Sequence, residues 1–368
     1  MNAIRKISVI TAIGVFILTN TFGQLKEIDF IKGGLGDAQV LFREYLTPYA
    51  NAFGANLNGG WYNTAKPHKL GGFDITVTVN TAWAPLSALT MDLSTLGLEA
   101  TLGESANGMT APTIAGKRTA DRPFLAYNMD NPADPGNIVT LAQYEVPNGT
   151  GVNIVPLPMA QLSLGLPFGT EVTGRYLPNL DFGNAGSIGL WGVGLKHSIF
   201  QHIPGIKRLP VLDGSVQGGY TKLNSYANVN FTPDSYAENL VSDILIFKGQ
   251  KINLDVEAYT INFVASQTLP VVTFYQAIGY STTKTRVSLK GNYPISRLET
   301  DSADPYFGQV VVTDEDVITD PLDMQIENTK DLRLNAGMRF KLGILTIHFD
   351  YTKANYGVVS AGLGISFR

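Results

Sequence analysis

Residues 332–342 read LRLNAGMRFKL, and the pattern continues as ILTIHFDY at 344–351 and GVVSAGLGISF at 357–367. In each segment apolar residues occupy alternate positions, with mostly polar or small residues between them. Because successive side chains of a strand point to opposite faces of its sheet, the pattern predicts three strands with one apolar face each. The connections are very short, so the three strands should be antiparallel neighbours.

The last strand ends at Phe367, one residue before the end of the sequence. An apolar stripe that finishes in a C-terminal aromatic resembles the signal that outer-membrane barrel proteins present to their assembly machinery. The resemblance implies two partners: the barrel assembly machinery, through the strand that ends at Phe367, and outer-membrane lipid around the folded barrel.

The N-terminus predicts export. Arg5 and Lys6 precede an apolar run at 7–18, and a plausible cleavage site lies before Gln24. The run is shorter than the roughly 20 residues that a membrane-spanning helix needs. We therefore expect a signal peptide at residues 1–23 and a multi-pass β-barrel in the outer membrane of a Gram-negative cell.

The composition agrees with a lipid-facing barrel. The chain has 368 residues, with 27 basic and 31 acidic side chains, and the resulting net charge of −4 argues against a nucleic-acid partner. Only 16% of the residues are charged, while 38 are glycine. There is no cysteine, so no disulfide framework is possible.

One segment of the exported chain has helical rather than strand periodicity. Asp37 is a possible N-cap, Gly54 is placed to end the helix, and Pro48 should kink it. Residues 24–54 are therefore predicted to form a short helical plug or strap ahead of a barrel at 55–368.

The fold class predicted for the rest is all-β, a transmembrane antiparallel β-barrel of about 14 strands. The fourteen segments are 55–64, 70–83, 89–99, 157–166, 169–178, 187–199, 209–222, 236–248, 251–265, 270–281, 284–294, 331–342, 344–352 and 355–367. An even number is what bacterial barrels require.

Connection lengths predict the orientation. With a periplasmic N-terminus, the periplasmic turns fall at 84–88, 167–168, 200–208, 249–250, 282–283 and 343. Five of these six are short, whereas the long insertions at 100–156, 223–235 and 295–330 all fall at the other end. The alternative fold is a secreted β-sandwich, but Tyr and Trp near many strand ends favour the barrel, as interfacial girdles would.

The segments NGGWYNTAKPHKLGGFDITVTVN (58–80) and GLWGVGLKHSIFQHIPGIKRLP (189–210) resemble those of an uncharacterised Bacteroidota exported-protein family. More distantly, a helical segment before 14 strands is similar to the long-chain fatty-acid and hydrocarbon transporters of the outer membrane. Their Asn-Pro-Ala motif is missing from the barrel start, and the one match, at 131–133, lies in a predicted outer loop.

This resemblance implies porin-like passive uptake of small hydrophobic or amphipathic, fatty-acid-like molecules. The alternative is a structural or surface-interaction barrel without transport.

Two groups of basic residues are predicted to line the lumen as ligand-binding residues: Lys284, Arg286 and Lys290, and Arg333, Arg339 and Lys341. Such a wall could bind the carboxylate or phosphate of an anionic substrate. Alternatively, the charges pair with lumen carboxylates from Asp74, Asp255, Glu257 or Asp350, because buried charges are normally paired.

No catalytic site is expected, and the protein is predicted not to be an enzyme. His348, Asp350 and Ser360 could in principle form a hydrolase triad, but they occupy the polar strand face, whereas a membrane phospholipase needs its nucleophile on the lipid face. The acidic stretch at 300–331 is predicted to be a solvated loop, with calcium binding as the alternative. The four histidines lack metal-ligand spacing, so neither a metal nor a cofactor is expected.

Overall fold

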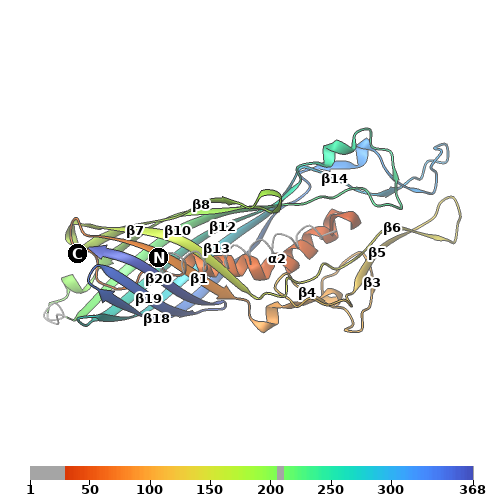
Figure 1. Cartoon of the computed structure of the whole chain (residues 1–368). Coiled ribbons are helices and arrows are strands. Elements are labelled where there is room, and N and C mark those ends of the chain that lie inside the picture. Colours follow the sequence, from red (N-terminus) through yellow and green to blue (C-terminus); the bar gives the residue numbers. More distant parts are fainter. Residues whose placement is uncertain (1–29, 205–210, 368) are drawn as a thin grey trace.

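A computed structural model describes residues 30–204 and 211–367 (Figure 1). The predicted signal peptide at 1–23 and the first residues of the predicted plug lie outside the described residues. Ten strands form one closed barrel, in which each strand pairs antiparallel with its neighbours along the chain and β20 closes the circle onto β1. The barrel strands are β1 (Phe73–Trp83), β7 (Ile154–Leu166), β8 (Thr170–Asp181), β9 (Gly186–Ser198), β10 (Leu212–Asn228), β12 (Lys251–Thr268), β13 (Val272–Lys290), β18 (Asp323–Leu342), β19 (Leu345–Lys353) and β20 (Gly357–Phe367).

The predicted count of about 14 strands is wrong, although the all-β barrel class is confirmed. Residues 55–64 finish a helix and continue inside the barrel, and 89–99 and 236–248 lie in the connections between barrel strands. The two segments at 270–281 and 284–294 belong largely to one long strand, β13. Local alternation could not separate these cases, because short alternating stretches also occur in ordered loops.

The outer wall of the barrel carries an apolar band. Its exposed side chains include Ile75, Val77, Leu162, Leu164, Val193, Leu195, Ile261, Ile278, Leu334, Phe349 and Leu363. An aqueous surface rarely exposes so large an apolar area, whereas a barrel that spans a membrane must do so. The fold is therefore that of a transmembrane β-barrel of the outer-membrane type.

The polarity of the two strand faces reverses along the longer strands. In the membrane part of β12, Phe263 points outward and the buried Asn262 inward. Nearer the loops, Val256 points inward and Glu257 outward. The strands therefore rise beyond the membrane, where the outer face meets water and the inner face becomes a hydrophobic core.

The three longest connections lie at one end of the barrel, and the other end, with Phe73 and Phe367, has mostly short ones; we call the latter the turn end. Its connections are 167–169, 199–211, 269–271 and 343–344, and those of the opposite loop end are 84–153, 182–185, 229–250, 291–322 and 354–356. The predicted placement of the long insertions at one end is confirmed, but the short connections 182–185 and 354–356 lie there too. Three predicted periplasmic turns are wrong, because 84–88 and 249–250 lie at the loop end and 282–283 lies within β13.

The long loops fold into small sheets beyond the barrel (Figure 1). Their strands are β2 (Thr90–Asp92), β3 (Thr101–Gly103), β4 (Thr110–Pro112), β5 (Phe124–Asp130), β6 (Ile138–Glu145), β11 (Glu238–Asn239), β14 (Asn292–Pro294), β15 (Arg297–Leu298), β16 (Val310–Val312) and β17 (Val317–Thr319). Short 3-10 turns occur at Phe30–Gly33, Leu86–Ala88, Leu93–Thr95, Pro167–Gly169, Gly183–Ala185, Phe200–His202, Ile244–Phe247 and Asp314–Asp316.

The predicted N-terminal helix is confirmed as α2 (Leu35–Asn58), with Pro48 inside it. Gly54 does not end the helix, which continues for another turn to Asn58. The helix starts among the loops and enters the barrel, where it contacts β1, β7, β10, β12, β13, β18 and β20 (Figure 1). Within the described ranges, no helix has the length and apolar character needed to span a bilayer.

Candidate functional site

Helix α2 fills the loop-end half of the barrel with apolar side chains. Leu41, Phe42, Tyr45 and Leu57 are fully buried. They belong to one hydrophobic cluster with the inward-facing residues Leu157, Leu190, Leu223, Val256, Val287 and Leu289. This half of the interior is therefore packed like the core of a soluble protein.

Three asparagines fix the end of the helix to the wall. Asn56 donates from Nδ2 to the Val155 carbonyl oxygen at 2.6 Å, and Asn80 donates to the Asn56 carbonyl oxygen at 2.7 Å. Asn58 donates to Thr283 Oγ1 at 3.2 Å. These bonds join the helix to β1, β7 and β13, so it is held from several sides.

Residues 59–72, which we call the lumen segment, continue through the membrane half of the barrel to β1. The guanidinium carbon of Arg175 lies 3.5 Å from the centroid of the Trp61 ring. Gly194 and Gly219 leave room for the indole, because a Cβ at either position would lie 2.6 or 2.4 Å from a ring atom. Trp61 is therefore enclosed by β8, β9 and β10.

Arg175 also holds the backbone where α2 meets the lumen segment. Its Nη1 donates to the Leu57 carbonyl oxygen at 2.8 Å, and its Nη2 donates to the Gly59 carbonyl oxygen at 2.6 Å. Its Nε donates to Gln161 Oε1 at 2.8 Å. One buried arginine thus fixes the helix end and the Trp61 ring together.

A buried charge cluster ties the lumen segment to the turn end. The Glu171 carboxylate lies 2.7 Å from Lys196 Nζ and 2.6 Å from His68 Nδ1, and it accepts the His68 backbone N–H at 2.9 Å. His68 Nε2 lies 3.2 Å from Ser366 Oγ. Nearby, the Ala65 backbone N–H donates to Ser266 Oγ at 3.0 Å. The segment is therefore bonded to β8, β12 and β20.

Little space remains beside this segment. A chamber of about 20 Å³ is lined by Trp61, Tyr62, His68, Asp74, Glu171 and His348, among others. A volume of that size holds a single water molecule.

The second predicted basic group does face the barrel interior. Arg333 and Arg339 are buried there, and Lys341 is half-buried on the same face of β18. Arg339 Nη2 lies 3.3 Å from the Asp74 carboxylate. Arg333 has its Nη1 atom buried without a hydrogen-bond partner in the described structure. Arg339 therefore follows the alternative prediction, in which a lumen charge pairs with a carboxylate such as Asp74 instead of binding a substrate.

The first predicted basic group lies on the outer face, so its lumen placement is a wrong prediction. Lys284 and Arg286 are exposed, and Arg286 donates to both oxygens of Asp323 at 2.5 and 2.7 Å. Lys290 pairs with Asp320 at 2.9 Å. The cause is that β13 is one unbroken strand through 282–283, so Lys284, Arg286 and Lys290 share the outward face with Ile278. Beyond the membrane this outward face meets water and carries polar residues, while the inward face is apolar.

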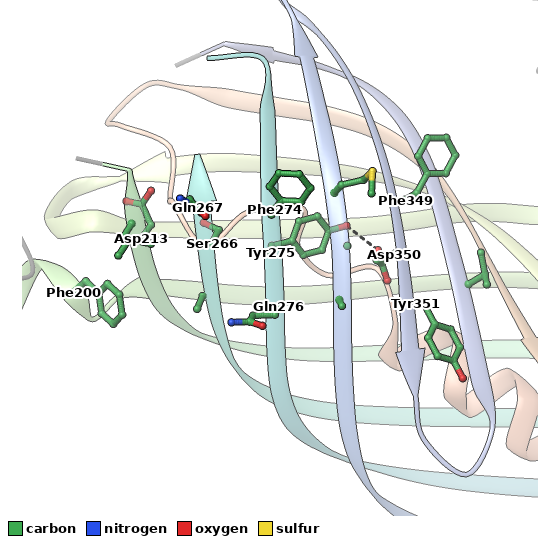
Figure 2. A pocket seen from close by; sticks show the side chains of 16 residues that line it. Phe200, Asp213, Ser266, Gln267, Phe274, Tyr275, Gln276, Phe349, Asp350 and Tyr351 are labelled. Carbon is green, nitrogen blue, oxygen red and sulfur yellow. Dashed lines mark hydrogen bonds between the residues drawn. The ribbon is translucent and has the colours of Figure 1, made fainter. Parts of the chain in front are cut away.

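The candidate triad is not assembled. His348, Asp350 and Ser360 are all buried and inward-facing, but Ser360 lies opposite Asp350 in the register, not opposite His348. Asp350 accepts hydrogen bonds from Tyr275 Oη at 3.0 Å (Figure 2) and from Asn335 Nδ2 at 2.8 Å. Among the described residues, none forms a hydrogen bond with either ring nitrogen of His348, so the serine has no paired base there.

The sequence did not reveal the two residue pairs that hold the lumen segment. Trp61 and Arg175 are far apart in the chain, as are His68 and Glu171, so no spacing rule links them. A third pair that the sequence did not reveal, His197 and His202, meets at the turn end with the two Nε2 atoms 3.1 Å apart. The sequence indicated these contacts only by placing charged residues, such as Glu171, Arg175 and Lys196, within predicted strands.

At the loop end, Asp37 joins the start of α2 to the first long loop. Its carboxylate accepts the backbone N–H groups of Glu99 and Ala100 at 3.0 Å, and the hydroxyl of Tyr127 at 2.8 Å. Burial, with the neighbouring Tyr144 and the Asp37 carboxylate, raises the pKa of Tyr127. The phenol therefore stays protonated and remains a donor.

The acidic stretch pairs its carboxylates with protein groups. Asp316 accepts the Thr313 backbone N–H at 2.9 Å and pairs with Arg297 at 3.1 Å, and Arg297 also pairs with Glu299 at 2.7 Å. Among the residues that the structure describes, no three or more potential metal ligands cluster. The calcium alternative for this loop stays a prediction.

Several solved outer-membrane structures are similar to this chain. The translocator domain of the autotransporter NalP from Neisseria meningitidis shows 9% identity and a TM-score of 0.31, covering 89% of this chain and 99% of that one. The outer membrane protease OmpT from Escherichia coli shows 7% identity and a TM-score of 0.31, with coverages of 80% and 97%. The attachment invasion locus protein Ail of Yersinia pestis shows 10% identity and a TM-score of 0.25, covering 81% of this chain and 99% of that one.

No curated protein sequence matches the chain. The resemblance to fatty-acid transporters therefore stays a prediction. One family profile, by contrast, matches residues 1–367, almost the whole sequence. The chain belongs to the family of unknown function DUF6588.

Proposed function

We propose that this protein is an outer-membrane barrel with a sealed lumen that carries a folded platform at the cell surface. The observation that supports this proposal is the filling of the lumen by α2 and the lumen segment. The helix packs against seven barrel strands, and the segment is bonded to the wall on several sides.

Passive uptake of fatty-acid-like molecules is the competing proposal. It would require the lumen segment to leave the wall or a path to open around it. Each broken hydrogen bond costs about 1 kcal/mol net, and separating the buried Glu171 from Lys196 costs more because each charge would remain in the barrel interior. Opening is therefore expensive, and a sealed barrel is the better explanation of this geometry.

The platform consists of two sets of loops that meet: the loop 84–153 is one set, and the loops 229–250 and 291–322 together are the other. Tyr236 Oη donates to the Leu141 carbonyl oxygen at 3.2 Å, and the Leu240 backbone N–H donates to the Val312 carbonyl oxygen at 2.8 Å. Between the two sets lies a groove of about 440 Å³, lined by Val139, Thr140, Gln143, Tyr236, Glu238, Gln309 and Val310. We assign this groove as the place where an external partner would dock on the platform.

Export and assembly complete the proposal. An N-terminal signal would direct the chain across the inner membrane, and the apolar stripe of β20 ending at Phe367 would engage the barrel assembly machinery. The Phe367 ring packs beside the Phe73 ring, with the centroids 4.9 Å apart and the planes tilted by 32°, at the point where the barrel closes. Recognition of this strand would therefore precede closure.

Uptake into proteoliposomes separates the two proposals. Oleate and hexadecane serve as anionic and neutral probes, and protein-free vesicles give the background rate. A sealed barrel predicts that protein-containing vesicles take up both probes at the background rate. Faster, saturable uptake of either probe would favour transport and overturn the sealed-barrel proposal.

Hydrogen exchange on the protein in nanodiscs tests the platform. The backbone amides that pair β5 with β6 should exchange far more slowly than unstructured peptide amides, because they are bonded within a folded sheet. Exchange at the rate of an unstructured peptide throughout 84–153 and 229–250 would contradict a folded platform, whatever the uptake assay showed.

A further inference from the structure

The lipid-facing wall carries a groove of about 920 Å³ over β12, β13, β18 and β19 (Figure 2). Its lining includes the outward side chains Phe274, Gln276, Met338, Phe349 and Tyr351. The apolar side chains among them are 39–49% exposed. The groove therefore faces the membrane and offers a shaped surface to whatever occupies it.

Gln276 interrupts this apolar wall. Along β13 its outward neighbours are Phe274 and Ile278, which are 47% and 50% exposed. Across the sheet it lies opposite Ala265 on one side and Ala336 on the other. Because the alanine side chains are short, the surface is recessed on both sides of the Gln276 amide. In the described part of the chain, no group forms a hydrogen bond with the Gln276 side chain.

A primary amide without a partner is unfavourable in hydrocarbon, because its two donors and its acceptor lose their bonds to water. Lipid tails cannot replace those bonds. A second glutamine amide can, because each amide donates an N–H to the carbonyl oxygen of the other. Small residues beside a polar group are also what allows two membrane segments to approach closely.

We propose that this wall is the interface of a homodimer in the membrane, in which the Gln276 amides of two copies pair across a two-fold axis. A two-fold interface places the same surface on both copies, so residues near the axis meet their own counterparts. Gln276 lies at the axis, with Ala265 and Ala336 giving the room for close approach. Phe274, Met338 and Phe349 pack around the amide pair and keep lipid away from it.

Cysteine cross-linking tests the geometry, because the chain has no native cysteine. Ala336→Cys places one thiol beside Gln276 while leaving the amide intact. Leu162→Cys is the matched control: it is also lipid-facing but lies on β7, five strands round the barrel from β13. In proteoliposomes at a low protein-to-lipid ratio, a short bis-maleimide should dimerise Ala336→Cys and leave Leu162→Cys monomeric. Equal cross-linking of both variants, or of neither, would overturn the proposal.

The amide itself is tested by substitution. Gln276→Leu should raise the dimer dissociation constant by about five- to thirtyfold, the range expected for polar contacts between membrane segments. Gln276→Asn keeps an amide and should retain part of the affinity. Single-molecule photobleaching counts the subunits, and heat-modifiable gel mobility shows that each variant has folded. A folded Gln276→Leu barrel with unchanged dimer affinity would refute the amide pair.

Discussion

Replacing Trp61 by alanine should loosen the lumen segment without removing the barrel around it. The indole is 5% exposed and lies under the Arg175 guanidinium at 3.5 Å. It fills the space left by Gly194 and Gly219. The substitution therefore creates a cavity against three strands and removes a cation–π contact.

The size of the effect follows from these contacts. Truncating a buried tryptophan to alanine costs about 3–5 kcal/mol, most of it from lost packing. If the segment opens locally, its open population should rise from roughly a hundredfold to a few thousandfold, since each 1.4 kcal/mol is a factor of about ten. The hydrogen bonds of Arg175 to the Leu57 and Gly59 carbonyls persist, so α2 itself should stay in place.

Thiol labelling measures the opening. Thr64→Cys introduces the only thiol of the chain at a position that is 1% exposed. A maleimide should label Thr64→Cys slowly, and Trp61→Ala should raise that rate by the factor above. Trp191→Ala is the matched control, because Trp191 faces lipid and is 47% exposed. Equal labelling rates with and without Trp61, in barrels shown to be folded, would refute the role assigned to the indole.

Three further predictions concern other contacts. Glu171→Gln should destabilise the barrel by about 3–5 kcal/mol in urea titration, because Lys196 is left buried without its partner, and Glu171→Gln with Lys196→Met should recover part of the loss. Lys290 lowers the pKa of Asp320, so their contact stabilises the loop above the ordinary carboxyl pKa and is lost as pH falls through the lowered one. The protection factors of the amides at 291–322, which are corrected for the pH dependence of intrinsic exchange, should fall at acid pH, and Asp320→Asn should abolish that change. Phe367→Ala should reduce folded barrel in isolated outer membranes more than the lipid-facing Leu363→Ala does, and equal yields would argue against the assembly signal.

The closing strands could be predicted because one physical rule governs them. Between Leu332 and Phe367 the outward side chains meet lipid along the whole paired length, so strict alternation reveals both the strands and their faces. The placement of the long loops at one end followed in the same way. The strand count failed because the alternating segments 55–64, 89–99 and 236–248 belong to the helix end or to loops, and because the single strand β13 was divided in two.

The contents of the lumen could not be predicted from local pattern. Whether Arg175 binds an anion or holds a tryptophan depends on which distant segment fills the barrel. The same holds for Lys196, whose partner Glu171 is its neighbour only across the sheet. Lys284 and Arg286 were placed inside by alternation within a segment that was too short. Only the register of the complete strand shows that they face outward.

Ion conductance across a planar bilayer tests the sealed lumen most directly. The folded wild-type barrel, inserted from detergent and verified by gel mobility, should give no discrete current steps above the bare-bilayer background. Trp61→Ala should give no steps either, because α2 still fills the loop-end half of the lumen in that variant. A stable, ohmic open-channel current from the wild-type protein would contradict the account, because it would require a water-filled path where α2 and the lumen segment lie.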